Sequence, residues 1–512
     1  MLASPSCQGV AGGRRQQAAA PRGAAAPLLL PAPAGARRGP RGCWQQRPWS
    51  SSPRSAPGPL PPRAGASAPP AADAAPAPPA AVVPLYTGKR AVVVGAGPAG
   101  STAAMFLARQ GMTVDVFERR PEPRDDEVDT GRAYIIIVIP RGQAALNDLG
   151  VPLPSAAEYK TKGTVRHNKK GQVGVSREEG NVTFRRSSLA QYLIDQARAA
   201  FPTAIRFHFG AALEGVDIAG RTAAFTGPGG RVAARYDLLV GADGVGSAVR
   251  AALQGHFPDM TVAVTDSGRE YKTYRGLRGN IEPDVTAHSN PDGTYSGTMS
   301  LKTGGFEGLA TAADYEGLLR AKFVGLPDAW VPAIAAQVVN ETPSPAGKRI
   351  RCSRLDGPGV LLLGDAAHAV TPVFGQGANS ALESCKVLGQ VLAEAGGKLD
   401  EVPARFTAAR LEDMHALNEL DAKAYSFFRR RGLADPDFLQ LLSHVLVGTI
   451  LSKLVPFLYG RQPALLQLGS SVRYSTITAA VRRDSLAAAA AFAALGLWLG
   501  VKLAARLAAG GA

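Results

Sequence analysis

The stretch KRAVVVGAGPAGSTAAMFLARQGMTVDVFERR, residues 89–120, constrains the fold of this 512-residue chain more than any other part. An apolar run from Ala91 to Val94 leads into a Gly-x-Gly-x-x-Gly turn. A segment of small and apolar residues follows, and a second apolar run ends at Glu118. This order predicts strand, turn, helix and strand, the unit that binds a dinucleotide at the helix N-terminus.

Each glycine of that turn has a separate expected role. Gly95 allows the tight turn, Gly97 lets the backbone approach a pyrophosphate, and Gly100 lets the helix pack against the strand. The unpaired N–H groups and the dipole of the helix N-terminus favour the anion. Glu118, 18 residues after Gly100, is placed to accept a hydrogen bond from a ribose hydroxyl. FAD and NAD both use this turn, so it does not choose between them.

Two later segments repeat the pattern of an apolar strand followed by an aspartate. YDLLVGADGVGSAVR, residues 236–250, presents Asp243 after Gly241, and GVLLLGDAAHAV, residues 359–370, presents Asp365. With these three segments in this order, the chain resembles the class A flavoprotein monooxygenases. Their signatures are the glycine-rich turn, a central "DG" segment and a C-terminal "GD" segment.

The resemblance implies FAD as the cofactor and Asp243 as part of its site. Asp365 would accept hydrogen bonds from the ribityl chain. The run Gly375-Gln376-Gly377 would begin a helix whose bare amides approach the pyrimidine edge of the flavin, where negative charge gathers. His368 is expected to pack near the cofactor and not to act as an acid or base.

Within this class the chain is most similar to the kynurenine 3-monooxygenase family, from residue 89 to the C-terminus. The segments that carry the similarity are GRAYIIIVIPRGQAALNDLG, RRSSLAQYLIDQA, GDAAHAVTPVFGQGANSALESC and RFTAARLEDMHALNELDAKAYSFFRRR. The similarity implies that Arg132 and Arg186 contact FAD. It also implies Pro372 at the flavin, with Phe374, Asn379 and Tyr425 as candidates for the substrate pocket.

One segment departs from the family pattern. The family places an arginine for the substrate carboxylate in an Arg-x-Arg strand between its "RG..AL" and Arg-x-x-Leu helices. The corresponding stretch here, EYKTKGTVRHNKKG, cannot be aligned to put an arginine there without a gap. Arg166 and Lys162 are nearby candidates, and the identity of the substrate stays open.

The middle of the chain predicts an antiparallel sheet that shapes a substrate pocket. KTYRGLRGNI, GTYSGTMSLKT and GGFEGLATAA have short alternating runs. Tyr274, Tyr295 and Met299 are expected in the core or roof of this sheet and not as substrate contacts.

The C-terminal segment predicts a membrane anchor. Leu486 to Val501 is 16 residues long and almost free of polar groups, with Arg482 and Arg483 before it and Lys502 after it. That is just under the usual minimum of about 17 residues for a spanning helix, and Lys502 can extend its side chain toward the interface. A buried core helix is the alternative.

The N-terminal segment, residues 1–84, predicts a cleavable organelle transit peptide. It contains nine Arg, no Lys, no Glu, a single Asp and 18 of the 39 Pro. Arginine-rich, acid-poor composition is typical of both plastid and mitochondrial leaders, and the prolines oppose the amphipathic helix of the mitochondrial type. The sequence therefore predicts the chloroplast, with the mitochondrion or a permanently disordered basic arm as alternatives.

The rest of the chain carries about half of the net charge of +16, without long blocks of one sign, so no nucleic-acid groove is predicted. After removal of the leader, Cys352 and Cys385 remain. They have no metal-ligand spacing and form no disulfide framework, and no metal site is predicted.

The predicted fold is α/β: a Rossmann-like FAD domain interleaved with an antiparallel-sheet substrate domain, then a helical C-terminal region. The expected parts are the transit peptide at 1–84, the FAD domain at 85–257 and 346–400, the substrate sheet at 258–345, C-terminal helices at 401–481, and the anchor at 482–512.

The resemblance implies that NADPH or NADH reduces the flavin transiently, and that O2 then forms a flavin C4a-hydroperoxide. This species would transfer one oxygen atom to a small, electron-rich, aromatic substrate. One alternative is a reductase of isoprenoid-type substrates, which has the same fold. Another is a non-catalytic membrane redox flavoprotein.

Overall fold

The computed structural model describes residues 83–123, 135–154, 166–168, 171–173, 181–277, 288–289, 295–428, 434–454, 457 and 463–509. These residues belong to one compact unit that begins at Ala72. The predicted leader, apart from Val83 and Pro84, lies outside the described residues.

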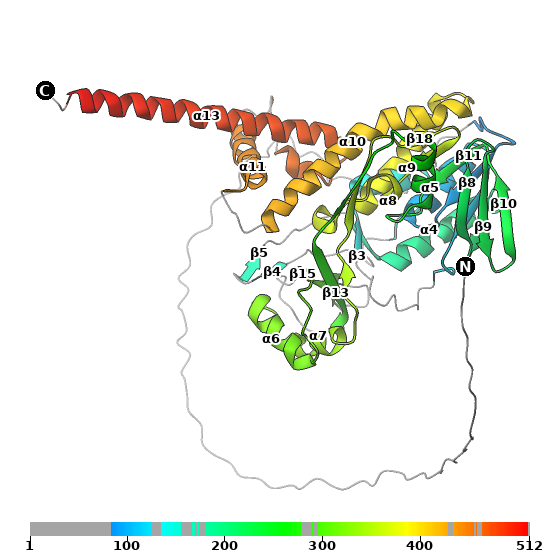
Figure 1. The fold of residues 1–512 in the computed structure, drawn as a ribbon, viewed down its shortest axis with the longest axis horizontal. Helices are drawn as coiled ribbons and strands as arrows, with labels where there is room; N and C mark the ends of the chain where they lie inside the picture. The colour runs from blue at the N-terminus through cyan, green and yellow to red at the C-terminus, as the bar shows by residue number, and fades with distance from the viewer. Residues whose placement is uncertain are drawn as a thin grey trace, which may run out of the picture. The chain divides into compact units, whose positions relative to one another are not determined.

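A six-stranded sheet forms the centre of the fold, and Figure 1 shows it among the N-terminal and middle segments. Its order is β18-β19-β11-β1-β2-β7, parallel except for the edge strand β18. The strands are β1 (Arg90–Val94), β2 (Thr113–Glu118), β7 (Ile205–Phe209), β11 (Leu238–Gly241), β18 (Asp356–Gly357) and β19 (Val360–Leu362). Central strands covered on both faces read as continuous apolar runs, and the four residues of β11 and the last four of β1 are all buried.

Helices pack around this sheet and against one another. They are α1 (Pro98–Arg109), α2 (Pro140–Asp148), α4 (Arg186–Ala200), α5 (Ala248–His256), α8 (Asp365–His368) and α9 (Gly377–Glu394). The helices α1 and α9 pack closely because Gly389 has no side chain: a Cβ there would lie 2.3 Å from the Phe106 ring.

Three small antiparallel sheets flank this core. The three-stranded sheet β10-β9-β8 packs on the end of β2 through the stacked rings of Phe117 and Phe225, whose centroids are 3.8 Å apart. The strands of these sheets are β8 (Ala212–Asp217), β9 (Thr222–Gly227), β10 (Gly230–Arg235), β3 (Ile135–Val138), β6 (Val182–Arg185), β4 (Arg166–Asn168) and β5 (Gly171–Val173).

A four-stranded antiparallel sheet, β14-β15-β13-β16, has a separate apolar core with two helices. Tyr274 and Met299 are buried in this core, as expected, and the side chain of Tyr295 lies outside the described residues. Its elements are β13 (Arg269–Leu277), β14 (His288–Ser289), β15 (Tyr295–Lys302), β16 (Ser344–Pro345), α6 (Ala312–Lys322) and α7 (Trp330–Val338). The ladder of β12 (Val262–Asp266) with β17 (Lys348–Cys352) joins its two ends to the rest of the chain.

The prediction of a strand in GGFEGLATAA was wrong. Gly304 and Gly308 adopt positive φ angles of 79° and 78°, which make turns there. Thr311 and Asp314 then form a reciprocal capping box that begins α6. The region predicted as a sheet therefore contains two helices as well.

The C-terminal region consists of α10 (Val402–Ala424), α11 (Pro436–Leu454) and α13 (Tyr474–Ala509), with several short 3-10 turns. Figure 1 shows α11 against α13, and the buried pair His444 Nδ1 and Asp484 Oδ2, 2.7 Å apart, joins them. Two helices, Pro436–Leu454 and Tyr474–Lys502, are long and apolar enough to cross a membrane. The large apolar side chains exposed on the latter are Leu486, Phe492, Leu495, Leu497, Trp498, Leu499 and Val501.

Candidate functional site

The carboxyl ends of β1, β11 and β19 meet at one edge of the central sheet. In the strand registers, Val94 pairs with Gly241, and Gly241 pairs with Leu362. The predicted residues Gly95, Asp243 and Asp365 each follow one of these strand ends. Ligands of open α/β sheets bind outside the carboxyl ends of the strands, so this edge is the candidate site.

The three glycines of the first turn have different surroundings. Gly95 has a φ of 102°, and a Cβ there would lie 2.4 Å from the carbonyl oxygen of Ala242. A Cβ at Gly100 would lie 1.8 Å from the carbonyl oxygen of Gly95. A Cβ at Gly97 would meet nothing within 4 Å, and the φ of −71° at this position suits any residue. Gly95 and Gly100 therefore serve close packing, whereas Gly97 faces open space.

The N-terminus of α1 has no side-chain cap, so its first N–H groups have no side-chain acceptor there. Glu118 lies beside this turn, since its Oε2 accepts from the N–H of Ala96 at 3.0 Å. Its Oε1 accepts from the N–H of Arg120 at 2.9 Å. These two bonds fix the carboxylate at the end of β2, next to the open side of the turn.

Asp243 accepts hydrogen bonds from the start of α5 through one of its two carboxylate oxygens. Its Oδ2 accepts from the N–H groups of Ala248 and Val249 at 2.6 and 3.2 Å. Its Oδ1 is buried and accepts no hydrogen bond from the part of the chain that the structure describes. A buried carboxylate oxygen without a donor is costly, so this atom fits a donor from a bound ligand.

Asp365 begins α8 directly after Gly364, whose φ is 62°. A Cβ at Gly364 would lie 2.9 Å from the Cβ of Ala99, so this strand end lies against the start of α1. His368, at the end of α8, is buried, and its Nε2 lies 3.3 Å from the hydroxyl of Ser384. Burial, with the nearby Arg410 cation, lowers the pKa of His368 to about 3. The imidazole is therefore neutral at physiological pH and packs in the core beside Ser384.

The segment Pro372–Gly377, called the flavin loop below, precedes α9. Pro372–Phe374 form a 3-10 turn, and Gly375 follows with a φ of 63°. No side chain caps the N-terminus of α9, and the position of a Cβ at Gly377 is almost open, with its nearest atom 4.0 Å away. The N-terminus of α9 therefore has open space beside its backbone.

Asn379 holds the flavin loop in place. Its Nδ2 donates to the carbonyl oxygens of Gly375 and Ile137 at 3.0 and 2.8 Å, and its Oδ1 accepts from the N–H of Ile139 at 3.0 Å. The side chain is fully buried. In this structure the Asn379 amide links the loop to the start of α2, and its place in the substrate pocket stays a prediction. Phe374 is half-buried against the C-terminal helices.

A cluster beside the loop was not predicted from the sequence. Asp421, from α10, accepts from the hydroxyl of Thr371 at 2.7 Å and lies 4.0 Å from Arg349 Nη1. The Arg349 guanidinium lies 5.6 Å from the centroid of the Tyr425 ring. Burial raises the pKa of Asp421 to about 6. Burial lowers the pKa of Arg269, on β13, and the nearby Tyr425 partly offsets this effect. The only sequence signal was an aspartate within an amphipathic helix, which normally indicates a solvated face.

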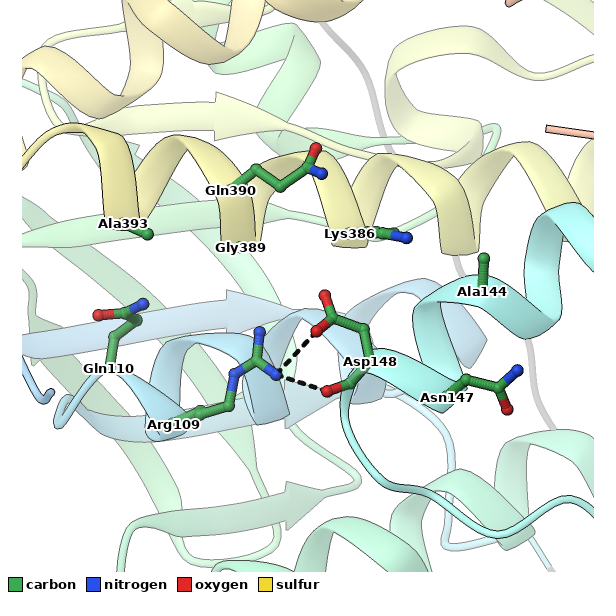
Figure 2. A pocket seen from close by; sticks show the side chains of 9 residues that line it. All are labelled: Arg109, Gln110, Ala144, Asn147, Asp148, Lys386, Gly389, Gln390 and Ala393. Atoms are coloured by element: carbon green, nitrogen blue, oxygen red, sulfur yellow. Dashed lines mark hydrogen bonds and ion pairs between the residues drawn. The ribbon is translucent and has the colours of Figure 1, made fainter. Parts of the chain in front are cut away.

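A separate hollow of about 680 Å³ lies between the far ends of α1, α2 and α9. Figure 2 shows Arg109 donating across it to the backbone and carboxylate oxygens of Asp148, at 2.7 and 3.3 Å, with Lys386 and Gln390 projecting from α9. Both α1 and α9 begin at the candidate site and end here. The hollow is therefore at the opposite end of these helices, and its lining contains none of the predicted site residues.

Some predicted residues cannot be placed. Arg132 and Lys162 lie outside the described residues. Arg186 begins α4 and Arg166 begins β4, but their side chains are not among those described.

Comparisons with known proteins agree with this geometry. The profile of the "FAD binding domain" family matches residues 89–266 and 332–398. Kynurenine 3-monooxygenase of Salinispora arenicola is 32% identical over 378 residues, which cover 67% of this chain and 81% of that protein. The enzyme of the same name from Stenotrophomonas maltophilia is 31% identical over 379 residues, which cover 68% and 81%. The chain belongs to the FAD-dependent monooxygenase family that includes kynurenine 3-monooxygenase.

Solved structures show the same fold at lower identity. The tetrameric form of 2-methyl-3-hydroxypyridine-5-carboxylic acid oxygenase has a TM-score of 0.53 and 21% identity, and the match covers 69% of this chain and 95% of that one. PqsL of P. aeruginosa, in complex with 2-aminobenzoylacetate, also has a TM-score of 0.53 and 21% identity, covering 68% and 98%.

The residues of this chain fit the FAD of its monooxygenase family. The open space at Gly97 and the uncapped start of α1 suit a pyrophosphate. The partnerless Oδ1 of Asp243 suits a hydrogen-bond donor from the ligand. The open space beside Gly375 and Gly377, at the uncapped start of α9, suits a flavin edge that gathers negative charge. The assignment of these individual residues to FAD stays a prediction.

Proposed function

We propose that this protein uses FAD and NAD(P)H to hydroxylate a small aromatic substrate with O2. The observation that carries the proposal is the meeting of three strand ends and the flavin loop at one sheet edge, in a chain of the FAD-dependent monooxygenase family. Both curated relatives above are named kynurenine 3-monooxygenases, and kynurenine is therefore the first substrate to test.

The chain's own residues bind and orient the cofactor. The start of α1 holds the pyrophosphate, Glu118 the ribose, and Asp365 the ribityl chain. Bound FAD would supply the redox chemistry of the reaction with NAD(P)H and O2. The amides of Gly375–Gly377 stabilise negative charge at the pyrimidine edge.

On the substrate side, the flavin loop faces the cluster of Arg349, Asp421 and Tyr425. A Cβ at Gly347, next to β17, would lie 3.7 Å from Pro372, so this strand runs beside the loop. Tyr425 offers a ring and a hydroxyl to an aromatic ligand, and Arg349 offers a cation. This combination supports an aromatic substrate with an anionic substituent.

The experiment titrates purified holoprotein with NADPH and NADH, alone and with candidate aromatics, kynurenine first. Flavin reduction is followed by absorbance and O2 by an electrode. We expect one aromatic compound to accelerate reduction and to be hydroxylated with matching O2 consumption. Turnover only without oxygen would favour a reductase. Bound FAD that no substrate turns over would favour a redox-sensing or partner-binding flavoprotein.

We also propose that α13 anchors the protein to a plastid membrane. The support is the run of exposed apolar side chains from Leu486 to Val501, with cations on either side of it. Plastid targeting is supported by the proline-rich, acid-poor leader. Residues 1–84 fused to a fluorescent protein should enter chloroplasts and be cleaved before Lys89. Import into mitochondria would contradict the plastid assignment, and retention in the cytosol would contradict targeting altogether.

A further inference from the structure

The first residue of α13 reaches the flavin loop. Tyr474 is fully buried, and its hydroxyl donates to Oε1 of Gln376 at 2.9 Å. Gln376 is the middle residue of the Gly-Gln-Gly run and is itself buried. The two residues are 98 positions apart in the chain. No other donor to this oxygen occurs in the part of the chain that the structure describes.

The side-chain nitrogen of Gln376 forms a hydrogen bond within the loop. Its Nε2 donates to the carbonyl oxygen of Phe374 at 3.1 Å, and the N–H of Gly375 donates to the carbonyl oxygen of Pro372 at 3.1 Å. The amide plane is therefore fixed at both ends. The Gln376 side chain therefore links the carbonyl group of Phe374, inside the loop, to the hydroxyl of Tyr474.

Tyr474 is fixed in turn by a buried ionic cluster. The guanidinium of Arg141, from α2, lies 4.0 Å from the centroid of the Tyr474 ring. Arg141 pairs with Glu383 of α9 and donates to the carbonyl oxygen of Val472. Arg410, from α10, binds the other oxygen of Glu383 at 2.6 Å. Three helices, α2, α9 and α10, thus contribute to the cluster around this ring.

The residues on either side of Tyr474 also form hydrogen bonds to α10. Asp413, from α10, accepts from Arg473 Nε and from the N–H of Ser475, both at 3.0 Å. Burial would raise the pKa of Asp413, but the hydrogen bonds from Ser475 and Arg473 outweigh it, and the pKa is lowered. Asp413 is therefore ionised at neutral pH and keeps the first turn of α13 in register with α10.

We propose that Tyr474 is a positioning residue of the cofactor site. Its hydroxyl sets the flavin loop through Gln376, and the seating of the first turn of α13 thereby controls how the loop amides meet FAD. The inference rests on the assignment of FAD to this loop and is independent of which substrate is oxidised. It deepens the proposed function by assigning the C-terminal helix a role in the site.

The test replaces Tyr474 by Phe, which removes the hydroxyl and keeps the ring beneath Arg141. The matched control is Tyr86→Phe. Tyr86 is equally buried, and its hydroxyl donates at 2.8 Å to the carbonyl oxygen of Leu392, at the other end of α9. Both variants lose one buried hydrogen bond to the same helix, so their losses of general stability are comparable.

Three quantities are measured for each variant: the dissociation constant of FAD from titration of apoprotein, the visible spectrum of bound flavin, and hydrogen exchange of the Gly375–Gly377 amides in apoprotein. For Tyr474→Phe we expect about a tenfold rise in the dissociation constant, an altered spectrum and faster exchange at the loop. For Tyr86→Phe all three should match the wild type. Equal values for the two variants would overturn the proposal.

A double-variant cycle with Gln376→Leu guards against misfolding of the single variant. Replacing both partners by apolar groups avoids an unsatisfied buried oxygen, so Tyr474→Phe with Gln376→Leu should melt higher than Tyr474→Phe alone. Its affinity for FAD should equal that of Gln376→Leu within twofold. Additive losses of affinity would show that the tyrosine acts elsewhere. Wild-type protein that binds FAD but oxidises no aromatic compound would contradict the proposed function and leave this cycle intact.

Discussion

Gly97→Ala separates cofactor binding from folding at the first turn. The backbone at Gly97 suits alanine, and a Cβ would meet nothing within 4 Å. Gly97 is the N-cap of α1, and replacing a favourable N-cap by Ala costs on the order of 1 kcal/mol. For a chain of this size the apoprotein should melt only about 2 °C lower. The added methyl group, however, would occupy the space through which the pyrophosphate approaches the turn.

We therefore expect the dissociation constant of FAD to rise at least about tenfold, equivalent to roughly 1.4 kcal/mol. It is measured by quenching of flavin fluorescence on titration into apoprotein, and the melting temperature by circular dichroism. Gly100→Ala should behave differently, because its Cβ would lie 1.8 Å from the carbonyl oxygen of Gly95. Such overpacking costs about 1–3 kcal/mol or more, so stability and FAD binding should fall together.

Gly255→Ala is the matched control. Gly255 lies in α5, and a Cβ there meets nothing within 4 Å. Alanine in a helix is favoured over glycine by about 1 kcal/mol, so this variant should melt slightly higher and bind FAD normally. If Gly97→Ala bound FAD with wild-type affinity, the open space at Gly97 would not be the pyrophosphate site, and the interpretation of the glycine-rich turn would be refuted.

Three further predictions concern the aspartates and the tail. Asp365→Ala should weaken FAD binding about ten- to a hundredfold, the loss of roughly 1.5–3 kcal/mol expected for a hydrogen bond to a charged group, and normal affinity would contradict the ribityl assignment. Deletion of 482–512 should release the protein from membranes with FAD still bound. Leu495→Arg should weaken membrane attachment, because a charge at the centre of a spanning helix costs about 2.5–3.5 kcal/mol. If the truncated protein aggregates and loses flavin, the helix belongs to the core. Burial raises the pKa of Asp421 from 3.8 to about 6, so the folded protein retains a proton that the unfolded chain releases, and the free energy of unfolding falls by up to about 3 kcal/mol as pH rises from about 4 to 6. Asp421→Asn should remove this contribution, which melting curves from pH 4 to 8 would detect as a pH-dependent difference from the wild type; a constant difference would refute it.

The residues assigned to the cofactor could be chosen from the sequence alone. The glycine-rich turn, Asp243 and Asp365 each belong to a local pattern of strand, turn and helix. In a parallel sheet such patterns place their residues at the same edge, whatever the rest of the fold does. The apolar run in α13 and the acid-poor composition of residues 1–84 could also be recognised in the sequence, because hydropathy and composition do not depend on tertiary contacts. The turns at Gly304 and Gly308 were missed because their alternating neighbours imitate a strand.

Only the tertiary structure decided which polar residues are buried and what they hold. Asp421 and Thr371 are 50 residues apart, and Tyr474 and Gln376 are 98 apart. In the sequence, Asp413, Arg410 and Glu383 look like the solvated face of ordinary helices. Asp413 and Arg410 are buried, and Glu383 is partly buried, because α2, α9, α10 and α13 converge, and each charge meets an opposite charge or a hydrogen-bond partner. A buried charge is tolerated only when such partners surround it, and that condition depends on the packing of distant helices.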